Sequence, residues 1–85
     1  MQVESVHERI PVSALFDGRG GVKPLRARFA GRDYRIERVT FDWATREGAY
    51  PVRHFTAKTS DGDVLKLSLC LPDLVWWLEE IQMSG

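Results

Sequence analysis

The sequence contains few of the residues from which disulfides and metal sites are built. Among its 85 residues there is one cysteine, Cys70, and there are two histidines, His7 and His54. A single cysteine cannot form an intramolecular disulfide, and a closed zinc site needs four ligands, usually Cys or His at short spacings. We therefore expect no disulfide, no metal and no cofactor, with His54 as an ordinary solvated strand residue.

The sequence also has no long apolar run. None approaches the roughly 20 residues that a transmembrane helix requires. The first twelve residues lack the charged-then-apolar order of a signal peptide. These absences lead us to expect a cytoplasmic protein with no membrane partner.

No catalytic motif is present either. The glycine-rich stretch at 17–21 lacks the GxxxxGK[ST] spacing of a phosphate-binding loop, and none of the serines lies in a nucleophile motif. The acidic pairs Asp61/Asp63 and Glu79/Glu80 are typical of a turn and of a solvated face. We therefore predict that the protein is not an enzyme.

The net charge is low as well, because twelve basic and twelve acidic residues cancel. A formal charge of zero and a pI near 6.7 argue against strong nonspecific attraction to nucleic acid. The charge is nevertheless uneven along the chain, since residues 17–38 carry seven basic and three acidic side chains. With 44% hydrophobic and 28% charged residues, the composition is typical of one soluble globular domain spanning residues 1–85.

The stretch LRARFAGRDYRIERVTFDW, residues 25–43, predicts a β-hairpin. Apolar and polar residues alternate on both sides of a short turn, which is the period of a half-buried strand. We place a two-residue turn at Gly31-Arg32, because glycine tolerates the positive φ that such turns require. This turn would set Phe29 opposite Tyr34 in the core.

The second arm of this hairpin changes parity. Its apolar residues stand at even positions up to Ile36 and at odd positions from Val39 to Trp43. One extra residue near Glu37-Arg38, a β-bulge, would bring both sets to the same side. Alternatively, the strand is long and passes from one sheet into another, so that it buries different faces.

Further alternating segments predict more strands. They lie at 8–16, 52–59 and 64–71, and the last two flank the turn signal at 60–63. Residues 1–9 are weakly patterned, and we expect them to be partly disordered. The fold class is therefore all-β or mainly β: an antiparallel meander of five or six strands, which could curl into a small partial barrel.

The C-terminal segment, residues 72–82, is ambiguous from its pattern alone. Leu74, Trp77, Leu78 and Ile81 lie at helical spacing, which allows one short C-terminal helix. The β-rich context favours a last strand instead. Both alternatives stay open on the pattern of these residues.

The hairpin resembles one found in a group of small uncharacterised bacterial β domains. Their signature is an Arg-Phe pair followed by Gly-Arg-x-Tyr-Arg and a β-branched residue. The matching residues are Pro24, Arg28, Phe29, Gly31, Arg32, Tyr34, Arg35, Ile36, Val39 and Trp43, then Phe55, Asp61, Gly62, Leu65, Trp76 and Leu78. The chain departs at Ala30, where the group often has an aromatic residue. The resemblance implies a compact antiparallel β domain with a C-terminal strand, and it implies no activity.

The arginine-rich hairpin, residues 25–38, is one candidate for binding. Arginine has fork-shaped donors suited to phosphates and other anions, and the predicted turn sets Arg28 opposite Arg35. The candidate residues are Arg26, Arg28, Arg32, Arg35 and Arg38. Such a surface predicts nucleic-acid binding through the phosphate backbone, although Asp33, Glu37 and solvent could simply screen these charges.

The second candidate is the apolar segment of Trp76, Trp77 and Leu78. A one-layer sheet cannot bury both faces of this segment, and such a surplus often marks an interface or a homodimer. The alternative is that all three tryptophans of the chain belong to the core. Our leading hypothesis is a non-catalytic module that binds a protein partner or associates with itself, and nucleic-acid binding is the alternative.

Overall fold

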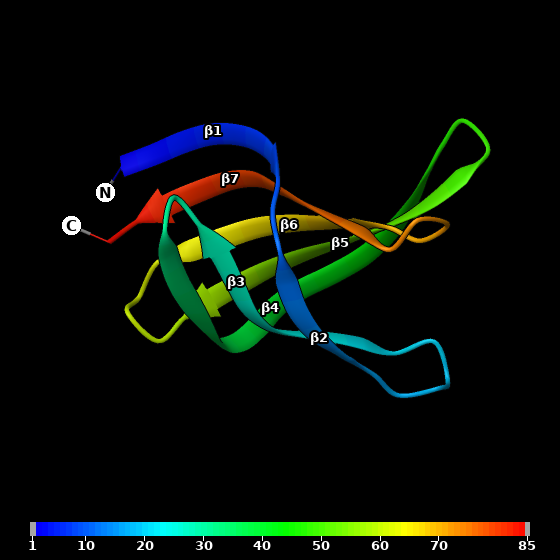
Figure 1. Ribbon diagram of the computed structural model, residues 1–85, viewed down its shortest axis with the longest axis horizontal. Coiled ribbons are helices and arrows are strands. Elements are labelled where there is room, and N and C mark those ends of the chain that lie inside the picture. The colour runs from blue at the N-terminus through cyan, green and yellow to red at the C-terminus, as the bar shows by residue number, and fades with distance from the viewer. Residues whose placement is uncertain (1, 85) are drawn as a thin grey trace.

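The computed structural model describes residues 2–84, and over this range the chain is all-β, with no helix and therefore none able to cross a membrane. The strands are β1 (Gln2–Arg9), β2 (Val12–Phe16), β3 (Val22–Phe29), β4 (Arg32–Glu47), β5 (Tyr50–Thr59), β6 (Val64–Cys70) and β7 (Val75–Met83). They form one antiparallel sheet in the order β1-β7-β6-β5-β4-β3-β2 (Figure 1). The all-β class and the meander are confirmed, but the expected five or six strands are wrong, because there are seven.

The two chain ends pair with each other. Residues 2–9, which we expected to be partly disordered, form β1, and β1 pairs with β7 from Gln2↔Met83 onward. Met1 lies outside the described residues. The C-terminal segment is a strand and not a helix, since β7 also pairs with β6. Partners on both sides satisfy the backbone of β7, and this outweighs the helical spacing of its apolar residues.

The β3–β4 hairpin turns one residue earlier than the sequence predicts. Ala30 and Gly31 both have positive φ, 53° and 74°, which is typical of a type I′ turn. Phe29 therefore lies opposite Arg32 instead of Tyr34. The predicted turn at Gly31-Arg32 is wrong because Ala30, a residue with a Cβ atom, takes the left-handed conformation.

β4 is 16 residues long and changes its partner along its length. It pairs with β3 over Arg32–Arg35 and with β5 over Ile36–Glu47. The strand therefore passes from one part of the sheet into another, as one of the two alternatives predicted. Among the described residues, no strand pairs with the β3 side of residues 36–47.

Two bulges in β4 decide which of its side chains are buried. The predicted bulge is present, because the register with β5 shifts between Ile36 and Arg38. A second, unexpected shift lies between Val39 and Phe41. It reverses the parity again, so that Phe41 and Trp43 turn outward and are 69% and 45% exposed.

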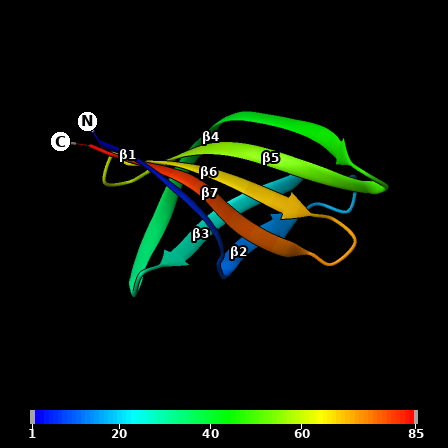
Figure 2. The same ribbon diagram turned by 90° about the horizontal axis from the view of Figure 1, so that it is seen from above.

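The two edge strands of the sheet, β1 and β2, are consecutive in the chain. The sheet is therefore strongly curled, because a short connection joins its two edges. Between them, the backbone N–H of Ile10 donates to the carbonyl of Trp76 in β7 at 3.1 Å. The carbonyl of the next residue, Pro11, accepts from the N–H of Arg28 in β3 at 3.0 Å. The chain thus crosses from one edge of the open sheet to the other, and β2 and β3 lie across one face of the remaining strands (Figures 1 and 2).

The hydrophobic core fills the space inside this curl. Phe55 of β5 is fully buried at its centre, and its ring centroid lies 5.5 Å from that of Trp76. The buried cluster consists of Ile10, Ala27, Tyr34, Phe55, Leu65, Leu67, Leu69, Trp76, Leu78 and Ile81. Phe29, near the hairpin tip, is only half-buried against it.

We predict that Phe55→Ala lowers the free energy of unfolding by about 3–5 kcal/mol, the usual cost of truncating a buried aromatic side chain. Phe29→Ala should cost clearly less, because part of its ring already contacts water. Chemical denaturation of both variants tests this order. Equal midpoints for the two variants would contradict the placement of Phe55 at the core centre.

Candidate functional site

The predicted interaction surface of Trp76, Trp77 and Leu78 is divided between the two faces of β7. Trp76 and Leu78 are 6% and 0% exposed and belong to the core, because successive side chains of a strand alternate between faces. Trp77 points to the opposite face and is half-buried. The prediction that all three residues form one exposed surface is therefore wrong for Trp76 and Leu78.

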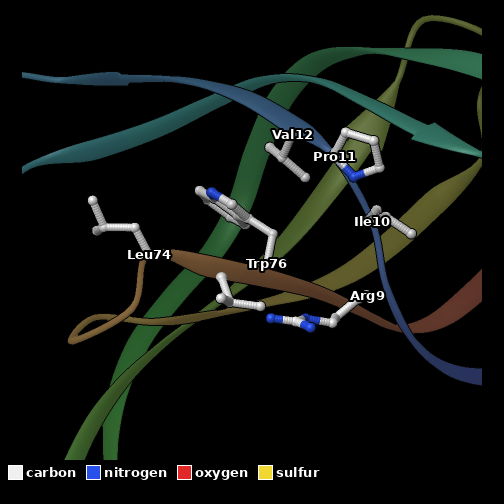
Figure 3. Close-up of a pocket in the computed structure, with 7 residues that line it drawn as sticks. Arg9, Ile10, Pro11, Val12, Leu74 and Trp76 are labelled. Atoms are coloured by element: carbon white, nitrogen blue, oxygen red, sulfur yellow. The ribbon is translucent and has the colours of Figure 1, made fainter.

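A shallow hollow of about 480 Å³ lies beside Trp76, where the chain passes from β1 to β2. The indole of Trp76 lies between Val12 of β2 and Leu74 of the β6–β7 turn (Figure 3). The hollow is lined by Arg9, Ile10, Pro11, Val12, Leu74, Val75 and Trp76. It is mainly apolar and marks the seam where the curled sheet meets itself.

Two of the five candidate arginines are engaged in local ion pairs. Arg28 lies opposite Asp33, and its Nη1 is 3.1 Å from an Asp33 carboxylate oxygen. Arg32 contacts Asp61 at 2.7 Å, and its guanidinium carbon lies 4.8 Å from the centre of the Tyr34 ring. The predicted pairing of Arg28 with Arg35 is therefore wrong, since the turn at Ala30-Gly31 shifts the register by one residue.

The structure brings Arg26 and Arg35 together instead. They lie opposite each other on β3 and β4 and line a hollow of about 560 Å³ with Lys23. We call this the basic hollow, and its lining is Ser13, Lys23, Leu25, Arg26, Arg35, Ile36 and Glu37. The fifth arginine, Arg38, pairs with Lys58 on the β4–β5 ladder and does not line the hollow.

The outer face of the sheet, turned away from the core, carries a row of aromatic rings. Trp43 lies opposite His54, and the two rings stack with centroids 5.1 Å apart and planes at 12°. His54 lies opposite Ser68, which lies opposite Trp77. His7 of β1 stacks on Trp77 at 4.7 Å and 15°. His54, which we expected to be solvated, is therefore half-buried in this row.

Glu79 lies on this outer face, in contact with His7 and Ser68. It is the extra residue of a bulge in β7, where the register with β6 shifts between Lys66 and Leu67. His7 Nδ1 lies 2.5 Å from Glu79 Oε1, and Ser68 Oγ donates to Oε2 at 2.7 Å. Each carboxylate oxygen therefore has one hydrogen-bond partner. The prediction of a simple solvated face does not hold for Glu79, which is half-buried.

The Glu79 carboxyl group is ionised at neutral pH. Burial raises its pKa, but the hydrogen bonds from His7 and Ser68, with the nearby charge of His7 and His54, lower the pKa more. An ionised carboxylate only accepts hydrogen bonds, so Nδ1 of His7 carries the proton in their contact. Ser68 donates its hydrogen bond to the Glu79 carboxylate and not to a histidine.

A groove of about 320 Å³ opens beside this cluster. Glu47 and Tyr50 of the β4–β5 arm and Trp77 and Glu79 of β7 are among the residues that line it. We call it the outer groove, and it is lined by His7, Glu47, Tyr50, Val52, Ser68, Cys70, Trp77 and Glu79. Local sequence patterns carry no signal of this set, because its members meet only through cross-strand pairing and through the bulge in β7.

The unpaired side of residues 36–47 is a further surface feature, which we call the free edge of β4. Every residue from Thr40 to Tyr50 is exposed. The β4–β5 arm projects beyond the rest of the sheet (Figure 1). Phe41 and Trp43 are among the largest exposed apolar side chains of residues 2–84.

No protein-family model matches the chain, and no curated protein or solved structure matches it either. The resemblance to small bacterial β domains therefore stays a prediction. Among residues 2–84, no group of three or more His, Cys, Asp or Glu side chains is placed to hold a metal ion. The surfaces described above are the observations from which a function can be argued.

We predict that Glu79→Gln destabilises the fold at neutral pH and less so in acid. The pKa of Glu79 is lowered on folding, so its stabilising effect is present above the ordinary value of 4.5 and is lost as the pH falls through the lower folded value. Urea denaturation from neutral pH to about pH 3 tests this. Glu8→Gln, on the exposed part of β1, controls for loss of one charge. A pH-independent difference between Glu79→Gln and the wild type would contradict the argument.

Proposed function

We propose that the protein is a non-catalytic binding module that associates with itself by pairing the free edge of β4 with that of a second copy. The observation that carries the proposal is the length and exposure of this edge, with one side of residues 36–47 unpaired within the described chain. Unpaired N–H and C=O groups on an exposed edge strand are a template for another strand. The cytoplasmic location and the lack of catalysis remain predictions from the sequence.

The composition of the edge supports pairing. Natural proteins protect free edges with lysine, proline, β-bulges or very short strands, and both bulges of β4 lie before residue 41. The segment FDWATRE, residues 41–47, contains neither lysine nor proline. It carries two large apolar residues, Phe41 and Trp43, which a second strand would partly cover.

The charges of the edge suit a second copy in particular. In an antiparallel pairing about a two-fold axis at Ala44, Asp42 of each copy lies opposite Arg46 of the other. Side chains opposite each other share one face, so both pairs are attractive, each contributing about 0.2–1 kcal/mol. Trp43 then lies opposite Thr45, and no like charges are opposed in the segment 41–47. Among residues 2–84, Arg46 has no intramolecular ion pair.

We predict that a charge swap tests this register. Asp42→Arg or Arg46→Asp alone sets like charges opposite each other twice and should weaken the dimer about tenfold or more. The double variant restores two attractive pairs and should restore the dimer. Light scattering over a concentration series measures the mass.

Asp73→Arg, in the exposed β6–β7 turn, is the matched control and should leave the dimer unchanged. Asp42 also lies 3.8 Å from Arg53, whose side chain is only 20% exposed, so Asp42→Arg removes this intramolecular contact as well, whereas Arg46→Asp leaves it intact. A wild type that stays monomeric at high concentration would overturn the proposal. A double variant as monomeric as the single variants would overturn the register at Ala44.

A second candidate function is binding of a nucleic-acid backbone at the basic hollow. The observation that favours it is the cross-strand pair Arg26–Arg35 beside Lys23, since opposed like charges are unfavourable without an anion between them. Arginine forks bind phosphate in bidentate fashion. We propose the basic hollow as the binding site in place of the predicted set of five arginines, because Arg28 and Arg32 form ion pairs with carboxylates.

We predict that any such binding weakens steeply with salt. Two or three phosphate contacts to a single strand give a log–log slope of about −1.4 to −2.1, at about −0.7 for each contact. Arg26→Ala combined with Arg35→Ala should flatten this slope, whereas Arg28→Ala should change it little. Fluorescence anisotropy with a labelled oligonucleotide gives the slope, and absence of saturation at low salt would exclude this function.

A further inference from the structure

The outer groove has the composition of a site for an organic cation, which goes beyond self-association at the free edge of β4. Two aromatic side chains, Tyr50 and Trp77, and two carboxylates, Glu47 and Glu79, are among its eight lining residues. Aromatic faces attract cations, and Trp and Tyr do so most strongly. We infer that the outer groove binds an N-alkylated ammonium group, such as a trimethylammonium.

The one basic side chain of the groove is already engaged by a carboxylate. Its lining contains no Lys or Arg. His7 is the one basic side chain in it, and its Nδ1–H is directed to Glu79 Oε1. His7 also stacks on Trp77, which fixes the orientation of the indole beside the carboxylate. The histidine therefore acts as a support for the two groups that would contact the ligand.

Glu79 decides which kind of cation suits the groove. Each of its oxygens already accepts one hydrogen bond, from His7 or from Ser68, which leaves fewer acceptor positions for a ligand that donates several. A guanidinium group would seek paired acceptors, and a primary ammonium is strongly hydrated and donates three hydrogen bonds. An alkylated ammonium that donates none is attracted by the charge and loses little on leaving water.

The size and floor of the groove agree with this class. About 320 Å³ is at the lower end of the range for small-molecule sites, which suits one head group with a chain leading out. Val52 and Cys70 give the groove apolar surface against which methyl groups can pack. Tyr50 stands 59% exposed on the arm, so its ring is accessible to an incoming ligand.

Calorimetric titration of the full chain with choline tests the inference. We expect saturable binding, and binding at least about tenfold weaker for 3,3-dimethylbutanol, which has the same shape without the charge. Tyr50→Ala and Glu79→Gln should each weaken choline binding about tenfold. Glu47→Gln, in the exposed arm, gives a second test of charge that does not touch the contacts of β1 with β7.

Glu80→Gln is the matched control, because Glu80 pairs with Lys66 at 3.0 Å and does not line the groove. The trimethylammonium group could belong to a protein side chain or to a small molecule such as choline. Titrations with a trimethyl-lysine peptide and with its unmethylated form distinguish these two sources. Equal affinity for choline and its neutral analogue would overturn the inference, as would no saturation at millimolar ligand. Asp42→Arg should bind choline like the wild type, so loss of self-association and loss of cation binding remain distinguishable.

Discussion

Two backbone hydrogen bonds, at Ile10 and at Pro11, hold this sheet in its curled form. The first ties the chain to β7 and the second ties it to β3, although these strands are second from opposite ends of the sheet order. A seven-stranded sheet left flat would expose one apolar face along its whole width. Because neighbouring residues bond to opposite ends, the sheet encloses a single core around Phe55.

The surfaces follow from this curl and from the bulges that accompany it. A bulge shifts every later side chain of a strand to the other face. In β4 the second bulge turns Phe41 and Trp43 outward, and in β7 a bulge gives Glu79 its place beside Ser68. The extra residues at these bulges thus determine which side chains enter the core and which line the outer groove. A change of register at a bulge would alter the side chains at both places.

Much of the fold is readable from the sequence, since alternation and turn signals act over short distances. The all-β class, the meander and the bulge near Glu37 are of this kind. Local patterns do not determine the β3–β4 register to within one residue, because the choice between Ala30-Gly31 and Gly31-Arg32 depends on which residue takes a left-handed φ. The strand at Gln2–Arg9 is not predictable from the sequence, because its pattern is weak and its partner is at the other end of the chain.

The candidate sites were less predictable for the same reason. The sequence identified basic residues in the hairpin, but ion pairs with Asp33 and Asp61 leave a smaller basic group than composition indicates. It gave no hint of the outer groove, where His7 and Glu79 are 72 residues apart. Cross-strand neighbours at such separations depend on register, and register depends on bulges that a single sequence does not reveal.

The pairing of β1 with β7 has a consequence for the order of folding. Strands β2 to β7 join through consecutive hairpins, whereas Gln2 pairs with Met83, so this contact closes almost the whole chain. Loop-closure entropy makes contacts of high sequence separation late and slow to form. We therefore expect the terminal strand to dock last. His7 reaches Glu79 and Trp77 only at that step, so the outer groove is complete only in molecules whose two ends have met.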